Sequence, residues 1–580
     1  MKQTNWLLLL TMCIGTFLCM LDTTVMNIAL PAIQNHMNVP LSQLSWALNI
    51  YTITFAALTI PLARAADLLG RNKVYLGGLI IFAIGSFVSG QADVPRMLII
   101  GRGVQSVGAA IIFPTSMTIA IATTPQAQRR LALLSVGLTQ GLAATLGPTI
   151  GGIVTQFLGW RWVFYVNLPL VALALIGVLI QLPIQKEPRI NAKVDYGGML
   201  LLIITLLSLT MALTQGPTWG WSSKTVISLF VLTIGCLISF IFVEHHVTSP
   251  MIRLDLFKDR QFSGAAVTVI LAGLIMVAVM VVMPTFFTQV QGKSELTAAL
   301  LITPASLAIF IVSPISGTLV ETLGPRIIIL LGFVSMSISY SVLGFMDPDH
   351  YWQTFIGLAC LGIGYGLVIG PITVLAASDF EGEKLTASQS VMGVLRQIGN
   401  ILAVAIFISL LTSNISNAKT AAWYQVQTTV GKTSLPSTVK TAILTTAHSR
   451  ISSDHVKTTR QHGSGITPAQ TQHLIQKETQ LAWNKDKVNQ LPSQLQPTVK
   501  QKISRTVTSQ VKATVAHDNG QVNQTTHQIT TLTKSHITTA FLKLYQWFLP
   551  LTLLSVPVCL LFYRRRNYLR LLHRSHNAAD

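Results

Sequence analysis

Two charged residues lie inside long apolar segments of this sequence, where charges are rare. Asp22 lies in Leu21–Pro31, towards the end of the apolar run 6–28, and Arg102 lies in the run 97–121. A charged side chain at the centre of a bilayer costs about 2.5–3.5 kcal/mol on insertion scales. Loss of water favours the neutral form of a carboxyl group, so Asp22 is a candidate for taking up and releasing a proton or a cation. The alternative is an acid that a neighbouring helix satisfies for purely structural reasons.

Arg102 needs an anion or several carbonyl groups around it, because a guanidinium does not lose its proton in proteins. Gln105 follows three residues later and shares its helical face. A second pair, Arg396 and Gln397, lies in the apolar run 388–411. An arginine inside the membrane needs a partner or a wet cavity. Gln105, Arg396 and Gln397 are therefore candidates for substrate binding or coupling, with helix packing as the alternative.

Asp67, Gly70 and Arg71 follow the second apolar run and are expected in a short loop. An acid there can meet helix N-termini and basic residues in one conformation and lose them in another. We predict a conformational latch at this position rather than a catalytic group. Small, acidic, glycine and arginine residues recur in the same order 254 positions later, over 317–326.

A stretch rich in small residues, 137–152, lies inside the apolar run 131–156. It holds five glycines and a proline, namely Gly137, Gly141, Gly147, Pro148, Gly151 and Gly152. This composition destabilises a soluble helix, whereas in a membrane small residues let two helices approach closely. Gly137 and Gly141 share one helical face, as do Gly147 and Gly151, and Pro148 is expected to bend the helix. A plain packing face is the alternative.

The composition of the chain indicates an integral membrane protein. Of its 580 residues 51% are hydrophobic and 10% are charged, against about 25% charged in a soluble domain. The formal net charge of +20 does not indicate nucleic-acid binding, because the basic residues fall mostly in loops between apolar runs. Five cysteines are scattered without a C-x-x-C pattern, so neither a zinc site nor a disulfide framework is expected.

Fourteen apolar runs are long enough to cross a bilayer. Most Lys and Arg residues of the short loops follow the even-numbered runs, and more basic residues lie at the C-terminus. The positive-inside rule then predicts that both termini are cytoplasmic. The runs cover 6–28, 44–64, 74–91, 97–121, 131–156, 161–183, 196–214, 224–243, 262–285, 297–320, 326–346, 352–377, 388–411 and 543–563.

The repeated pattern predicts an all-helical membrane fold with two six-helix halves and two extra central spans, a plan typical of transporters with a site near the midplane. Residues 412–542 differ, with 14 Lys or Arg, four Asp or Glu, seven His and much Thr and Gln. We expect them outside the cell as a solvated loop with some polar helix, for example at 467–488, or alternatively as a partner- or wall-facing segment. The predicted division is 1–183 for the N-terminal half, 184–261 for the extra spans, 262–411 for spans nine to thirteen, 412–542 for the loop, and 543–580 for the last span and basic tail.

Several of these strings together resemble the major facilitator superfamily, in particular its fourteen-span drug:proton antiporter branch of the quaternary-ammonium and multidrug exporter type. Leu21–Pro31 is similar to the branch's first-helix motif, Arg102–Ala109 to its fourth-helix motif, and Gly147–Gly152 to the antiporter motif of its fifth helix. Ser106 replaces the usual glycine, and the loop motif at 63–73 lacks some of its usual basic residues. The resemblance implies that Asp22 and Arg102 take part in proton coupling, and that the weakened loop motif gives a weaker latch.

The resulting hypothesis is a proton-coupled efflux transporter, not an enzyme, in the plasma membrane of a bacterium. By alternating access, it would export drugs or toxic compounds that are amphipathic and that we expect to be cationic. Its partners would be protons, a small-molecule substrate and the lipid bilayer. One alternative is a dedicated exporter of a single metabolite, peptide or lipid. An alternative of another class is a surface sensor or binding protein on a degenerate transporter scaffold. No cofactor, metal or nucleic acid is expected, and no nucleotide-binding G-x-x-x-x-G-K-[ST] string occurs.

Overall fold

The computed structural model of the chain is built from helices throughout its described regular elements. The basic stretch 184–194 and the tail 569–580, on which the predicted topology partly rests, lie outside the described residues. The structure describes residues 6–39, 41–125, 128–183, 195–247, 252, 254–376, 380, 382–433, 435, 437–452, 468–486, 488, 492 and 495–568.

The elements follow the order of the apolar runs. The first part of the chain forms α1 (Trp6–Met37), α2 (Leu41–Leu69), α3 (Arg71–Gly90), α4 (Pro95–Thr123), α5 (Arg129–Phe157), the short α6 (Trp162–Tyr165) and α7 (Asn167–Gln181). Two further helices, α8 (Tyr196–Trp219) and α9 (Lys224–His246), come next. A 3-10 turn η2 (Leu254–Lys258) leads to α10 (Arg260–Thr285), a π-helical turn η3 (Phe286–Val290), α11 (Glu295–Leu323), α12 (Pro325–Phe345) and α13 (Tyr351–Leu375). The last elements are α14 (Gly382–Gly431), α15 (Ser437–Ser452), α16 (Pro468–Lys485), α17 (Gln496–Ser555) and the 3-10 turn η5 (Val556–Leu561).

The predicted many-span helical fold is confirmed. Within the described residues, 13 helical segments are long and apolar enough to cross a membrane. α5 is not one of these segments, since glycine, threonine and glutamine take the place of large apolar residues along it. Its 29 residues nevertheless extend roughly 43 Å, and it packs lengthwise between α1 and α11, which makes it the fourteenth span.

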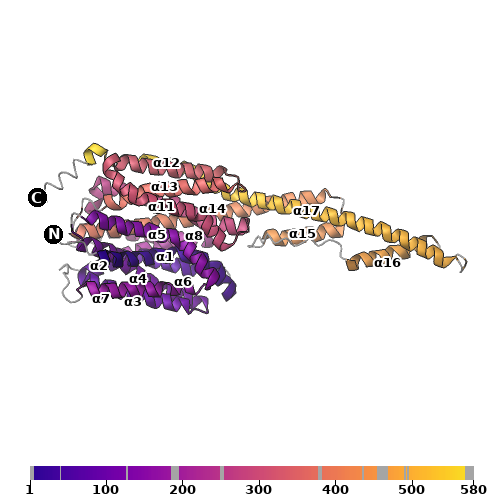
Figure 1. Ribbon diagram of the computed structural model, residues 1–580, viewed down its shortest axis with the longest axis horizontal. Helices are drawn as coiled ribbons and strands as arrows, with labels where there is room; N and C mark the ends of the chain where they lie inside the picture. The colour runs from indigo at the N-terminus through magenta and orange to yellow at the C-terminus, as the bar shows by residue number, and fades with distance from the viewer. Residues whose placement is uncertain are drawn as a thin grey trace. The chain divides into compact units, whose positions relative to one another are not determined.

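The chain divides into two compact units, which we call the membrane unit and the polar unit. The membrane unit comprises residues 1–288, 293–410 and 542–580, and the polar unit comprises 289–292 and 411–541. In the membrane unit, α4 packs against both α2 and α3, and α13 packs in the same way against both α11 and α12 (Figure 1). The second half thus repeats the helix pairing of the first at the positions that the sequence repeat connects.

Two glycines make the sharp junctions at equivalent places of the two halves. Gly70 joins α2 to α3 with φ 112°, and Gly324 joins α11 to α12 with φ 84°. These backbone angles are open to glycine and strained for other residues. The loop expected around Asp67, Gly70 and Arg71 is therefore wrong in extent: α2 continues to Leu69, α3 begins at Arg71, and a single residue makes the turn.

Substituting either junction glycine should destabilise the membrane unit. Gly70→Ala and Gly324→Ala are each expected to cost about 1–3 kcal/mol, because alanine strains this backbone conformation. At Gly324 the added methyl carbon would also lie 2.9 Å from the Cα atom of Arg565. Thermal unfolding of the purified protein in detergent measures the effect. Gly235→Ala, inside α9 with no atom within 4 Å of the new carbon, is the matched control, and an equal effect there would contradict the prediction.

The polar unit has an apolar core of its own. Its buried side chains come from α14, α15, α17 and the segments between them, namely Val426, Val430, Leu435, Ile443, Ala447, Ile451, Val522 and Ile529. Along α17, Val515, Val522 and Ile529 are buried at intervals of seven residues, the spacing of a coiled-coil seam. The polar helix expected near 467–488 is α16, and the solvated loop expected over the rest of 412–542 is largely helical in its described residues.

Candidate functional site

Asp22 and Arg102 meet inside the membrane unit. The Nη1 atom of Arg102, on α4, donates a hydrogen bond to Oδ2 of Asp22, on α1, and the two groups form an ion pair. Asp22 is 3% exposed and Arg102 is 1% exposed. The guanidinium carbon also lies 4.1 Å from the ring centre of Tyr51 on α2, a cation–π distance. The two charges that the sequence singles out are therefore each other's partners, away from solvent.

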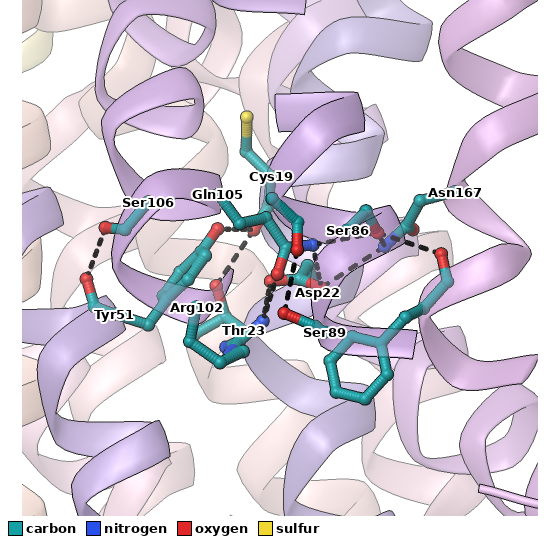
Figure 2. A network of polar contacts seen from close by, with 12 residues as sticks. Cys19, Asp22, Thr23, Tyr51, Ser86, Ser89, Arg102, Gln105, Ser106 and Asn167 are labelled. Atoms are coloured by element: carbon teal, nitrogen blue, oxygen red, sulfur yellow. Dashed lines mark hydrogen bonds and ion pairs between the residues drawn. The ribbon is translucent and has the colours of Figure 1, made fainter. Parts of the chain in front are cut away.

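A shell of amide and hydroxyl groups completes this site (Figure 2). Gln105 donates from Nε2 to Oδ1 of Asp22 at 2.8 Å, and Asn167 donates from Nδ2 to the same oxygen at 3.3 Å. Gln105 also accepts from Nη1 of Arg102 at 2.8 Å. Ser86 accepts from both amides and donates to the backbone carbonyl of Phe164 at 2.8 Å. The carboxylate thus has donors on both oxygens and connects α1 to α4 and α7, and the two amides connect this group to Ser86 on α3.

Close helix packing positions these side chains. Arg102 and Gln105 are three residues apart on α4 and point to one side of it. A Cβ atom on Gly85 of α3 would lie 2.2 Å from the backbone nitrogen of Gln105, so the missing side chain lets α3 and α4 touch there. This contact brings Ser86, the next residue, beside Gln105. On α2, the carbonyl of Tyr51 accepts from Ser106 at 2.6 Å and fixes the other side of α4.

The electrostatics of the site depend on the protonation of Asp22. With Asp22 ionised, the pair is neutral and both carboxylate oxygens accept hydrogen bonds. With Asp22 protonated, the positive charge of Arg102 would keep only neutral acceptors, namely Gln105 and the carbonyl of Ala47, whose oxygen lies 3.5 Å from Nε. A buried charge in such surroundings is costly. The neutrality of this enclosed site therefore rests on the pairing of Asp22 with Arg102.

The residues of the predicted latch lie at the α2–α3 junction. Asp67 is buried and pairs with Arg71 across Gly70, with 2.6 Å between Oδ1 and Nε. The neighbouring Asn72 donates to the carbonyl of Pro183 at 3.0 Å, which fastens the junction to the end of α7. The three residues are thus brought together, and their role as a latch stays a prediction.

The glycines of α5 lie on two faces of the helix. A Cβ atom on Gly147 would lie 1.8 Å from Oγ1 of Thr24, and one on Gly151 would lie 3.1 Å from the carbonyl of Val25, so this pair faces α1. Gly137, Gly141 and Gly152 face the second half, where their nearest neighbours belong to Thr373, Ile309, Leu296 and Ala299. α5 is described as one continuous helix, and the side chain of Pro148 lies outside the described residues.

Arg396 makes a separate contact between the halves. Its Nη1 atom donates to Oε1 of Gln140 on α5, and the phenol of Tyr365 on α13 is near enough to interact with it electrostatically. The amide of Gln397 accepts from Asn400 at 3.3 Å, one turn along α14. Among the described side chains, Arg396 has no carboxylate partner.

Comparison with known proteins identifies the family of the chain. The family model described as Major Facilitator Superfamily matches residues 12–404. The chain belongs to the Major Facilitator Superfamily. It is a multi-pass transporter of a bacterial plasma membrane, not an enzyme. It is 31% identical over 418 residues to multidrug resistance protein Stp of Mycobacterium tuberculosis, covering 72% of this chain and 78% of that protein.

Two further relatives match this transporter over a similar length. Multidrug transporter protein MdtP of Bacillus subtilis is 31% identical over 424 residues, with 72% of this chain and 78% of that protein covered. Riboflavin transporter RibZ of Clostridioides difficile is 27% identical over 418 residues, with 72% and 90% covered. The resemblance to multidrug exporters stated from the sequence motifs is thereby confirmed.

Several partners in the site of this transporter were not predicted from its sequence. Ser86, Asn167, Tyr51 and Gln140 are polar residues within or at the end of apolar helices, and such residues often serve packing alone. Asn167 falls in a segment, 159–169, that its aromatic residues mark as a membrane interface. Trp160 and Arg161 do form a cation–π contact, with 4.5 Å between the guanidinium and the ring centre. The signal for Asn167 was an amide at the start of an otherwise apolar helix.

Proposed function

We propose that this transporter exports amphipathic compounds in exchange for protons by alternating access, with Asp22 as the proton-binding group and Arg102 as its partner. The observation that carries the proposal is the enclosed Asp22–Arg102 pair. Of the acidic residues described in the membrane unit, Asp22 lies farthest from the ends of its helix. Its hydrogen bonds connect α1 to α4 and α7, so a change in its charge acts on the packing of these helices.

The coupling step follows from the charges of the pair. A proton that enters from outside neutralises Asp22 and removes the attraction that holds α1 to α4 through Arg102. Arg102 then gains stability by moving to other acceptors or to water, which favours a different packing of these helices. The glycine faces of α5, one against α1 and one against the second half, allow such a change with little steric cost. Release of the proton on the cytoplasmic side restores the pair.

Amphipathic cations are the first substrate class that we propose. A monovalent cation and a proton can compete for the same carboxylate, which couples their movements. The relatives named as multidrug resistance proteins support the export of more than one drug. The proton gradient supplies the energy, and the membrane potential adds about 2.3 kcal/mol per charge for each 100 mV.

Transport by everted membrane vesicles tests the proposal. Vesicles from cells that express the protein are given a panel of fluorescent cationic dyes and an imposed proton gradient, and dye entry and internal pH are recorded. We expect dye accumulation that needs the gradient and that dissipates part of it. Vesicles without the protein serve as the control. If the whole panel is ignored, multidrug export is wrong.

A dedicated exporter of one metabolite is the second candidate, and the similarity to a protein named as a riboflavin transporter favours it. The two candidates differ in competition. A multidrug exporter binds several unrelated dyes at overlapping sites, so each dye inhibits export of the others. Export of a single compound that no other dye inhibits would instead support the dedicated transporter.

Removal of the polar unit tests the alternative that the protein is a surface sensor on a transporter scaffold. Asp22, Arg102 and α5 all belong to the membrane unit, and the polar unit has its own apolar core. Phe407 and Phe548 lie on either side of the polar segment with 4.0 Å between their ring centres, so a short linker can join the helices there. We expect a chain with residues 411–541 replaced by a glycine–serine linker to keep gradient-driven dye export. Loss of export from a variant with an unchanged melting temperature would favour the sensor.

A further inference from the structure

Arg396 is a half-buried cation whose charge the proposed mechanism does not use. It is on α14 of the second half, twelve positions after Lys384, which is roughly 18 Å along the helix. Gln140, its partner on α5, is eleven positions after Arg129, or roughly 17 Å along that helix. Both ends are predicted to face the cytoplasm, so the contact lies near the middle of a hydrocarbon core of about 30 Å. The predicted topology thus places this contact at the midplane, between the two halves.

One edge of the guanidinium of Arg396 is unused. Its Nη1 atom is bound to Gln140, whereas Nε is buried without a hydrogen-bond partner among the described residues. Nε and Nη2 form the edge of an arginine that binds a carboxylate with two parallel hydrogen bonds. This edge makes no hydrogen bond in the described structure. Arg396 thus has the donors of Nε and Nη2 available for an acidic group.

Within the described part of the membrane unit, no acidic side chain supplies the missing negative charge. Asp22 already accepts hydrogen bonds from Arg102, Gln105 and Asn167. The charges of Arg102 and Asp22 cancel, so among the described residues the positive charge of Arg396 is not compensated by a carboxylate. Tyr365 and Gln140 are neutral at physiological pH. A ligand that brings a carboxylate would therefore be stabilised there.

The surroundings of Arg396 suit an aromatic or apolar body attached to that acid. One turn before it on α14 is Gly393, where an added Cβ atom would lie 3.0 Å from the Phe113 ring of α4. Phe113 is in edge contact with Phe55, with 5.7 Å between ring centres. Aromatic rings of the first half thus contact α14 of the second half one turn away from Arg396.

We infer that Arg396, oriented by Gln140, is a substrate subsite for a carboxylate, so the exported compounds include amphipathic acids and zwitterions as well as cations. The inference deepens the proposed export function and rests on it. The two arginines then have different roles, because Arg102 neutralises Asp22 whereas Arg396 selects the substrate. Alternating access exposes a midplane subsite to each side in turn.

A rhodamine with a free carboxylate and the methyl ester of the same dye test this subsite, since they differ by one negative charge. Export of both dyes is measured in everted vesicles for the wild type and for Arg396→Gln. A hydrogen bond to a charged group is worth enough to change affinity by about ten- to a hundredfold. We expect Arg396→Gln to lower transport of the acid relative to the ester by that factor, and Arg396→Lys to retain part of the preference. Arg96→Gln, an exposed charge at the outer end of α4, is the control.

Binding in detergent keeps the test decisive if a variant does not transport. Fluorescence anisotropy gives the dissociation constants of the acid and the ester for each purified variant, and thermal unfolding checks that the variant is folded. The ratio of the two constants should change in Arg396→Gln and stay unchanged in Arg96→Gln. Equal changes for acid and ester, or no change for either, would overturn the subsite. Failure of the wild type to transport either dye, with the binding preference intact, would instead count against the proposed export of these dyes.

Discussion

Asp22→Asn should abolish gradient-driven dye accumulation and leave dye uptake at the level of vesicles without the protein. Asparagine has nearly the same shape and still accepts a hydrogen bond, but it carries no titratable proton. Substrate movement is then separated from proton movement. Downhill exchange of dye across the membrane is expected to survive, because binding and helix rearrangement do not themselves require the gradient.

For Asp22→Asn, dye accumulation and internal pH are recorded in the same everted vesicles. Adding substrate to energised wild-type vesicles should release protons, and adding it to the variant should release none. Asp93→Asn is the matched control, since this acid pairs with Arg161 at 2.6 Å but its side chain is 82% exposed. Accumulation by Asp22→Asn with the pH dependence of the wild type would place the coupling proton on another residue.

The pair of charges was predictable from the sequence because a charge in an apolar run is conspicuous. Asp22, Arg102 and Gln105 stand out in the linear sequence. The spacing of Arg102 and Gln105 already places them on one face of a helix. Ser86, Asn167 and Tyr51 do not stand out, because lone polar residues are common in spanning helices. Their relevance arises only where α2, α3, α4 and α7 pack together, and close approaches such as that of Gly85 to Gln105 set this packing.

Two errors of prediction have the same cause, which is that hydropathy does not show where a helix begins or ends. The apolar run ends at residue 64, but α2 continues to Leu69, because hydropathy reports the thickness of the lipid and not the end of a helix. The polar unit was expected to be mostly loop because its apolar residues are sparse. A seam with one buried Val or Ile in every seven residues, as at Val515, Val522 and Ile529, is enough for helices that pack on one another.

Arg102→Ala should be the most destabilising single substitution in the site. It leaves the carboxylate of Asp22 buried at 3% exposure with amide donors but no cation. Removing one partner of a buried ion pair typically costs about 3–5 kcal/mol, because the remaining charge is uncompensated. The loss of the guanidinium from the face of Tyr51 adds a packing defect. Thermal unfolding in detergent should show a clear fall in melting temperature.

Arg102→Ala combined with Asp22→Asn separates charge from packing in this loss. The second substitution removes the unpaired carboxylate, so the double variant should recover much of the stability that Arg102→Ala loses. The two effects are then strongly non-additive, as expected for groups in contact. Arg161→Ala, which breaks the exposed pair with Asp93, should cost about 0–1 kcal/mol and serves as the control. If the double variant is instead less stable than Arg102→Ala, packing and not charge holds α1 to α4. Protonation of Asp22 would then not weaken the packing of α1 against α4, and the proposed coupling step would be wrong.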